Sequence, residues 1–194
     1  MAWPRGKKHV VTSRMNFFIL SGCSGGGKST LLSELEKRAY PVVPEAGRRV
    51  VAEALSTGSG CLPWMSPLSF VRACVRLHLE DLDRIGKTKG PVFLDRSLVD
   101  VISYLDFKQL PVPDDLKTVL EAPRYAPKVF LAPPWPEIFA TDCERQAPFE
   151  EAENEYRHLR RAFSGLGFEL IDLPKCPVKD RADFVEEYLA RVQP

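Results

Sequence analysis

The chain has 194 residues, of which 44% are hydrophobic and 27% charged, and its formal net charge is +1. These values are typical of a globular protein of one domain, and they exclude a strongly basic chain that nucleic acid or a membrane surface would attract. No apolar run reaches the roughly 18 residues that a membrane-spanning helix needs. We therefore expect neither a nucleic-acid partner nor a membrane partner.

The cysteines and the first residues indicate where the protein works. The five cysteines are odd in number and scattered, without a C-x-x-C pair. This spacing indicates neither a disulfide framework nor a zinc site, and it favours a cytoplasmic protein. Residues 1–15 are basic but lack the apolar stretch of a secretory signal. We expect a flexible tail over 1–15 and a single domain over 16–194.

Short apolar runs alternate with amphipathic segments along that domain. Strands are predicted at residues 16–20, 40–45, 91–95, 128–132 and 168–173. Helices are predicted at residues 28–39, 45–56, 67–86, 96–107, 114–122, 150–167 and 177–192. Buried strands that alternate with helices are typical of a parallel sheet with helices on both faces. The sequence therefore predicts an α/β fold of three layers, α/β/α, around a five-stranded parallel sheet.

A glycine-rich loop separates the first strand from the first helix. The pattern G-x-x-x-x-G-K-[ST] is met by Gly22, Gly27, Lys28 and Ser29, and the loop lies between an apolar strand and a helix as the motif requires. Glycines let backbone N–H groups curl around phosphate oxygens, and the following helix directs its positive end at the same anion. The residues expected to bind nucleotide are Gly22, Cys23, Ser24, Gly25, Gly26, Gly27, Lys28, Ser29 and Thr30. We call residues 22–30 the phosphate loop, in which Lys28 would reach the β and γ phosphates and Ser29 would bind Mg²⁺.

The second strand ends beside an acidic and two basic residues. Glu45 is followed by Arg48 and Arg49 in the same helical turn. Because ligands of parallel sheets lie at the carboxyl ends of the strands, Glu45 can accept a proton from a substrate hydroxyl while Arg48 and Arg49 bind the substrate. The alternative is a structural ion pair between Glu45 and Arg49 at i,i+4.

The third strand ends in Asp95, followed by Arg96. If this strand lies next to the first, Asp95 is close to the phosphate loop, where it can hold Mg²⁺ through water or orient the attacking group. Arg96 would contact phosphate or substrate. The alternative for Asp95 is the N-cap of the next helix, and the two roles are compatible.

The fourth strand is followed by a proline-rich loop, residues 133–149, that contains Arg145. A guanidinium group that closes over a transferring phosphoryl group lowers the barrier, and closure excludes water. The alternative is a solvated arginine. An acceptor pocket is expected between the Glu45 helix and residues 64–76, with Trp64 and Phe70 among the candidate walls.

The stretches GCSGGGKST, PEAGRR, VFLDRS and PPWPEIFATDCER occur in an order that resembles the P-loop kinase-like AAA-domain ATPase family. That group is similar to nicotinamide riboside kinases and to deoxynucleoside and nucleotide kinases, and the resemblance spans about residues 17–189. It implies a P-loop NTPase fold with strand order 2-3-1-4-5, Asp95 near Mg²⁺, Glu45 as base and Arg145 as lid arginine. The deoxynucleoside kinases carry Glu where this chain has Asp95, so the division of labour between Glu45 and Asp95 stays open.

Two functions follow from these motifs. The first is an ATP- and Mg²⁺-dependent kinase that transfers the γ-phosphate to a small nucleoside- or nucleotide-like acceptor, working as a monomer or homodimer. The second is an ATPase or nucleotide-dependent switch that acts on a protein partner. Because Arg96 stands where mechanical ATPases carry a water-polarising Glu, and because no N-K-x-D guanine reader is present, the first is favoured over an ATPase or GTPase.

Overall fold

The computed structural model describes residues 16–86, 88–120, 125–139 and 148–192. Its five strands are β1 (Phe17–Gly22), β2 (Val42–Val43), β3 (Val92–Asp95), β4 (Lys128–Ala132) and β5 (Glu169–Asp172). They form one parallel sheet in the order β2-β3-β1-β4-β5. The predicted fold class and strand order are therefore confirmed. The predicted tail over residues 1–15 lies outside the described residues.

The helices found in the described residues are α1 (Lys28–Lys37), α2 (Ala46–Thr57), α3 (Pro67–Ile85), α4 (Leu98–Phe107), α5 (Asp114–Val119), α6 (Phe149–Gly165) and α7 (Val178–Val192). A short 3₁₀ turn, Pro136–Ile138, follows β4. Residue types explain several boundaries: Pro67 occupies the first turn of α3, Gly58 ends α2 with a left-handed φ of 67°, and Ser97 caps α4. None of these described helices is both long and apolar enough to cross a membrane.

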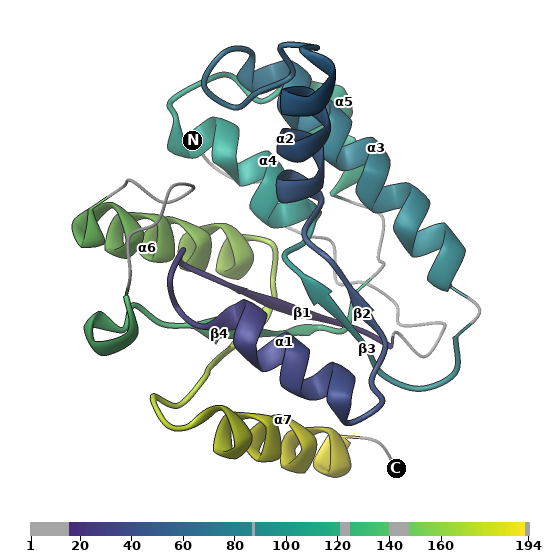
Figure 1. Ribbon diagram of the computed structural model, residues 1–194, viewed down its shortest axis with the longest axis vertical. Coiled ribbons are helices and arrows are strands. Elements are labelled where there is room, and N and C mark those ends of the chain that lie inside the picture. The colour runs from purple at the N-terminus through teal and green to yellow at the C-terminus, as the bar shows by residue number, and fades with distance from the viewer. Residues whose placement is uncertain (1–15, 87, 121–124, 140–147, 193–194) are drawn as a thin grey trace.

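Two hydrophobic clusters hold the helices on opposite faces of the sheet. The cluster that contains Ile19 and Leu94 joins the sheet to α3, α4 and α6. The cluster that contains Leu20 and Phe130 joins it to α1 and α7. Figure 1 shows α1 and α7 below the sheet and the other helices above it. Alternate side chains of one strand enter opposite clusters, which explains why the buried strands are apolar throughout.

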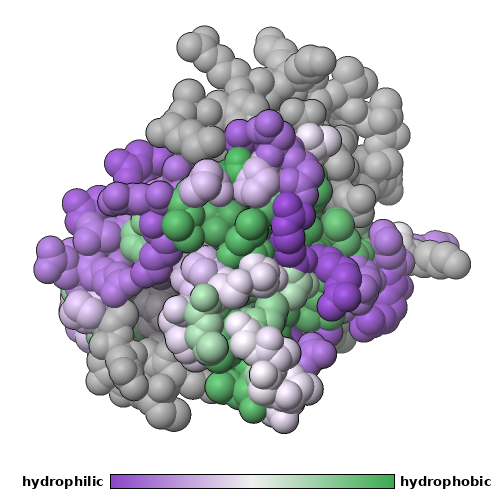
Figure 2. Space-filling view, turned by 90° about the horizontal axis from the view of Figure 1, so that it is seen from above, coloured by the Kyte–Doolittle hydropathy of each residue, from purple (hydrophilic) through white to green (hydrophobic). Residues whose placement is uncertain are grey.

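The end of the molecule formed by α2 and the start of α3 carries apolar side chains into solvent. Leu55, Trp64 and Met65 are each more than 60% exposed. The face seen from above in Figure 2 shows hydrophobic side chains gathered near its middle, with hydrophilic ones around them. This end of the molecule adjoins the helices that line the larger of the two pockets described below.

Candidate active site

The phosphate loop has the backbone conformation that its sequence predicts. Gly22, Gly25 and Gly27 have positive φ angles of 118°, 77° and 76°, which residues with a Cβ rarely adopt. A Cβ on Gly22 would lie only 2.2 Å from the carbonyl oxygen of Ala132 in β4. Gly27 is the N-cap of α1 and offers no capping side chain, so the amides of the first helical turn are open to an anion.

Lys28 lies folded back over this loop. The residue is 7% exposed, and its ammonium group donates hydrogen bonds to the carbonyl oxygens of Gly22, at 3.1 Å, and Cys23, at 2.6 Å. Burial, with the nearby positive charge of Arg96, lowers the pKa of Lys28. Phosphate oxygens would be stronger partners for this ammonium group than two neutral carbonyls, because donor and acceptor would then carry opposite charges.

Two pockets meet beside the phosphate loop. The smaller has a volume of about 270 Å³ and is lined by residues 24–30 of the loop together with Glu45, Arg48, Arg96, Ile138 and Arg181. The larger has a volume of about 420 Å³ and lies between α2, α3, α4 and α6, with Phe70, Tyr104 and Phe107 among its walls. Ser24, Glu45 and Arg96 line both pockets. A group bound in one pocket can therefore face a group bound in the other.

Arg96 stands at this junction among carboxylates. Its guanidinium nitrogens lie 2.9 Å from Glu155 Oε1, 3.4 Å from Glu45 Oε1 and 3.5 Å from Asp100 Oδ1. Burial disfavours its charge, but Glu155, Glu45 and Asp100 together outweigh burial and raise the pKa of Arg96. Its φ of 66° is left-handed, a conformation that costs a non-glycine residue about 1–3 kcal/mol and that concentrates at functional sites.

Asp95 is not the N-cap of α4, because Ser97 takes that place with Asp100 in a capping box. Asp95 lines the larger pocket. Its buried Oδ1 accepts no hydrogen bond from any residue that the structure describes. Burial and the charge of Glu45 raise the pKa of Asp95, against the opposing effects of Lys28 and Arg96. A buried carboxylate oxygen without a partner is costly, and this one is suited to receive a ligand.

Asp100 fixes the start of α4 against β1 and Arg96. Its Oδ2 accepts hydrogen bonds from the backbone N–H and the hydroxyl of Ser97, both at 2.8 Å, and its Oδ1 accepts one from Ser21. Burial raises the pKa of Asp100, while Arg96 and the serines oppose that effect. Asp100 thus positions the junction between β3 and α4.

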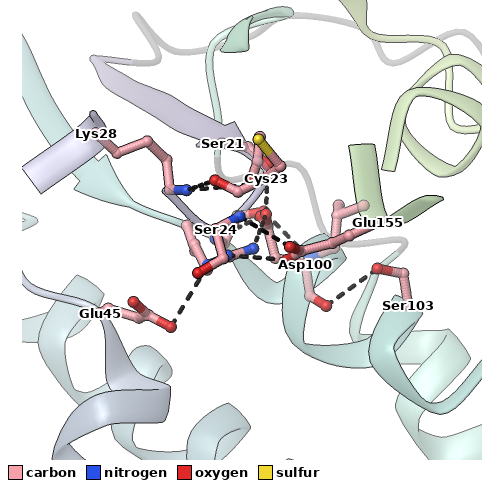
Figure 3. Close-up of polar contacts among 12 residues, drawn as sticks. Ser21, Cys23, Ser24, Lys28, Glu45, Asp100, Ser103 and Glu155 are labelled. Carbon is pink, nitrogen blue, oxygen red and sulfur yellow. Dashed lines mark hydrogen bonds and ion pairs between the residues drawn. The ribbon is translucent and has the colours of Figure 1, made fainter. Parts of the chain in front are cut away.

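Glu155 reaches the same place from α6. Its Oε2 accepts a hydrogen bond from the backbone N–H of Ser24 at 2.9 Å, and its Oε1 pairs with Arg96. Figure 3 shows Glu155 directed toward Ser24 while Lys28 turns toward Cys23. Burial works against ionisation, but Arg96, Lys28 and the Ser24 amide outweigh it and lower the pKa of Glu155. An anionic group therefore lies on the phosphate loop itself.

The arginines of α2 point to different partners. Arg48 lines the smaller pocket, and its Nε lies 3.1 Å from Glu45 Oε2. The guanidinium group of Arg49 pairs instead with Asp81 in α3. The alternative, an ion pair between Glu45 and Arg49, is therefore not formed in the structure. Arg49 lines neither of the two pockets.

Arg181 of α7 covers the other side of the loop. It is 5% exposed and donates a hydrogen bond to the carbonyl oxygen of Gly27 at 3.2 Å, and its guanidinium group lies 5.5 Å from the centre of the Trp135 ring. Burial lowers the pKa of Arg181. The loop after β4 and the last helix thus both contribute to the smaller pocket.

Of the acceptor-pocket walls expected from residues 64–76, Phe70 lines the larger pocket, whereas Trp64 is 67% exposed. The pocket also contains His78, whose Nε2 lies 3.0 Å from the hydroxyl oxygen of Tyr125. Arg145 falls outside the described residues.

The pattern along the chain did not single out Glu155, Asp100 or Arg181. Each has a signal in hindsight: a charged residue on a stripe that is otherwise apolar. Glu155 lies between the buried Ala152 and Leu159 of α6, with spacings of three and four residues. A charge at such a position must find a partner inside the fold, and here the partners are the phosphate loop and Arg96.

Solved structures of several kinases resemble this chain in fold. Thymidylate kinase from Ehrlichia chaffeensis has a TM-score of 0.60 at 15% identity, over 89% of this chain and 97% of that one. Deoxyadenosine kinase from M. mycoides, solved with dATP, has a TM-score of 0.58 at 15% identity, over 90% and 99%. The NadR protein, solved with NR, has a TM-score of 0.68 at 18% identity, and the match covers 90% of this chain but 52% of NadR.

At these identities the likeness shows the fold, which is that of P-loop kinases. No curated protein matches the chain. The model of one protein family, described as AAA domain, matches residues 17–181. The matched residues include the phosphate loop, Glu45 after β2, Asp95 at the end of β3, and Arg181. The chain belongs to this AAA domain family, with a kinase-like P-loop fold.

Proposed function

We propose that the protein is an ATP-dependent phosphotransferase that moves the γ-phosphate of ATP to a hydroxyl group of a small nucleoside- or nucleotide-like acceptor. One observation carries the proposal: the phosphate-loop pocket and the larger pocket share Ser24, Glu45 and Arg96 as walls. A hydrolase needs room only for water beside the terminal phosphate. A second pocket of about 420 Å³, walled by aromatic side chains, is large enough for a small organic molecule.

The loop fits a triphosphate and its metal. The cradle at Gly22, Gly25 and Gly27 has no space for a Cβ, and the unpartnered Oδ1 of Asp95 offers an oxygen ligand. In the part of the chain that the structure describes, no group of three or more acidic, histidine or cysteine side chains would hold a metal alone. Mg²⁺ characteristically takes one or two protein ligands plus nucleotide phosphates, and Ser29 and Asp95 are those ligands in this proposal. When bound, Mg²⁺ neutralises charge that develops on the phosphates.

The side chains then divide the remaining work. Lys28 leaves its two carbonyl partners for the β and γ phosphates. Glu45, a wall of both pockets, accepts the proton of the acceptor hydroxyl. Arg96 balances the charge of the moving phosphoryl group at the junction. Positioning of the two substrates face to face supplies much of the rate enhancement in this type of transfer. Arg48 contacts the acceptor or the terminal phosphate from α2.

The test is a panel of nucleosides, nucleotides and related metabolites, incubated with ATP and Mg²⁺ and read by mass spectrometry. We expect one or more acceptors to gain a phosphoryl group with wild-type protein and none with Lys28→Ala. Lys37→Ala is the matched control, since Lys37 is on the same helix and its side chain is 76% exposed. ATP hydrolysis that no panel member alters, with no phosphorylated product, would contradict transfer and favour an ATPase or switch.

A further inference from the structure

Glu155 occupies a place on the phosphate loop that an anion from the nucleotide would also seek. Its carboxylate accepts the backbone N–H of Ser24 at 2.9 Å. Backbone N–H groups in such loops are the donors that hold phosphate oxygens. Carboxylate and phosphate oxygens are both anionic acceptors, so they compete for one amide.

The contact lies at the end of the loop where the terminal phosphate must be. Ser24 lines both pockets, whereas Gly26, Gly27 and Lys28 line only the smaller one. In the proposed reaction, the phosphate that is transferred must lie at the boundary of the pockets, and the other phosphates lie deeper, toward α1. Glu155 therefore opposes the γ-phosphate and leaves the β-phosphate position open.

The second contact of Glu155 has the same consequence. Its Oε1 lies 2.9 Å from the guanidinium group of Arg96, the cation at the boundary of the pockets. A γ-phosphate that displaces the carboxylate gains both the Ser24 amide and a less neutralised Arg96. A diphosphate, which ends before this boundary, displaces neither contact.

We propose that Glu155 is a positioning residue that competes with the γ-phosphate for Ser24 and Arg96, and so sets the relative affinity for ATP and ADP. Since the competitor is an anion, it weakens ATP binding selectively and lets ADP bind at full strength. This inference rests on the proposed nucleotide site and does not depend on the identity of the acceptor.

The variant Glu155→Gln keeps an oxygen for the Ser24 amide but removes the charge. Because a hydrogen bond to a neutral oxygen is weaker than one to a carboxylate, the ratio of ADP to ATP dissociation constants should rise about tenfold. A purely structural role would weaken both nucleotides alike and leave the ratio unchanged. The ratio is therefore the readout that separates the two roles.

The experiment is calorimetric titration of ATP and of ADP, each with Mg²⁺, into wild type, Glu155→Gln and Glu150→Gln. Glu150 is in the first turn of the same helix and is exposed, so its variant should keep the wild-type ratio. Glu155→Asp is a second variant that keeps the charge but withdraws it by one methylene, and it should shift the ratio in the same direction.

Two outcomes would overturn the role of Glu155, and a third would contradict the proposed function. Wild-type ratios in both Glu155 variants, with nucleotide binding intact, would overturn the inference alone. Selective loss of ATP affinity in Glu155→Gln would also overturn it, because that result would make Glu155 a ligand of the Mg²⁺–triphosphate complex. Wild-type protein that bound neither nucleotide would contradict the proposed function itself.

Discussion

Asp95→Asn should stabilise the ligand-free protein and stop its reaction. The buried Oδ1 of Asp95 lacks a hydrogen-bond partner among the described residues, and burial with the charge of Glu45 raises the pKa of Asp95. Burial and Glu45 make the negative charge itself unfavourable, and a neutral amide of the same shape should recover about 1–2 kcal/mol by removing that charge. For a domain of this size that gain is a rise in Tm of about 2–8 °C.

The pH dependence of this gain has a definite sign. A carboxyl group whose pKa is raised in the folded state binds its proton more tightly there than in the unfolded chain, so its ionisation destabilises the fold. The destabilisation is absent below the unfolded pKa of about 3.9 and complete above the folded value. The Tm difference between Asp95→Asn and wild type should thus be largest near neutral pH and should disappear as the pH falls below about 4.

Thermal denaturation at several pH values tests the predicted gain in stability, and a phosphoryl-transfer assay tests the predicted loss of turnover. The control is Asp180→Asn, because Asp180 is exposed in the first turn of α7 and lines neither pocket. We expect ATP binding by Asp95→Asn to persist while turnover falls at least about 100-fold, as for the loss of one group that stabilises the transition state. An unchanged or lower Tm at pH 7, or normal turnover, would refute the reasoning.

Three further variants test other parts of the site. Lys28→Ala should weaken ATP binding at least about tenfold in titration calorimetry, because one charge-assisted contact to phosphate is lost, and Lys37→Ala should not. Gly22→Ala should lower the free energy of unfolding by more than about 2 kcal/mol in urea denaturation, since its Cβ would lie 2.2 Å from Ala132 O; normal stability would show that the loop can move. Glu45→Gln should remove the acid limb of the kcat–pH profile if Glu45 is the base, and an unchanged profile would assign that role elsewhere.

The strands were predictable because a short apolar run in the sequence is enough to indicate a buried strand. The strand at 128–132 was predicted with its observed bounds, and the helix at 67–86 was predicted within one residue. The strand expected at 40–45 shrinks to β2, Val42–Val43, because Pro41 and Pro44 cannot donate to a ladder. The apolar runs do not determine the order of the strands, because apolar strands of similar length can pair in many orders. The predicted order was instead implied by the family resemblance.

The site residues that follow directly from the end of a strand could be predicted from the sequence. The phosphate loop is contiguous in sequence, and Asp95 ends β3, whose neighbour β1 leads into that loop. Glu155 lies 131 residues from Ser24, and its role depends on how α6 packs above the sheet. Its charge on an apolar stripe signals a buried partner but does not identify that partner. Arg49 shows the converse, since its place in sequence suits the site while its side chain pairs with Asp81.

Asp95, Arg96 and Ser97 are consecutive, and the conformation of each one determines what its neighbours can do at the site. The left-handed φ of Arg96 ends β3 abruptly, which lets Ser97 cap α4 in place of Asp95. The Asp95 carboxylate is therefore not used as a helix cap, and its Oδ1 can accept a ligand. The guanidinium group of Arg96 pairs with three carboxylates at the boundary of the pockets. Those ion pairs offset the strain of about 1–3 kcal/mol that the φ angle imposes. The backbone turn at Arg96 therefore also determines that the neighbouring Asp95 lines the larger pocket.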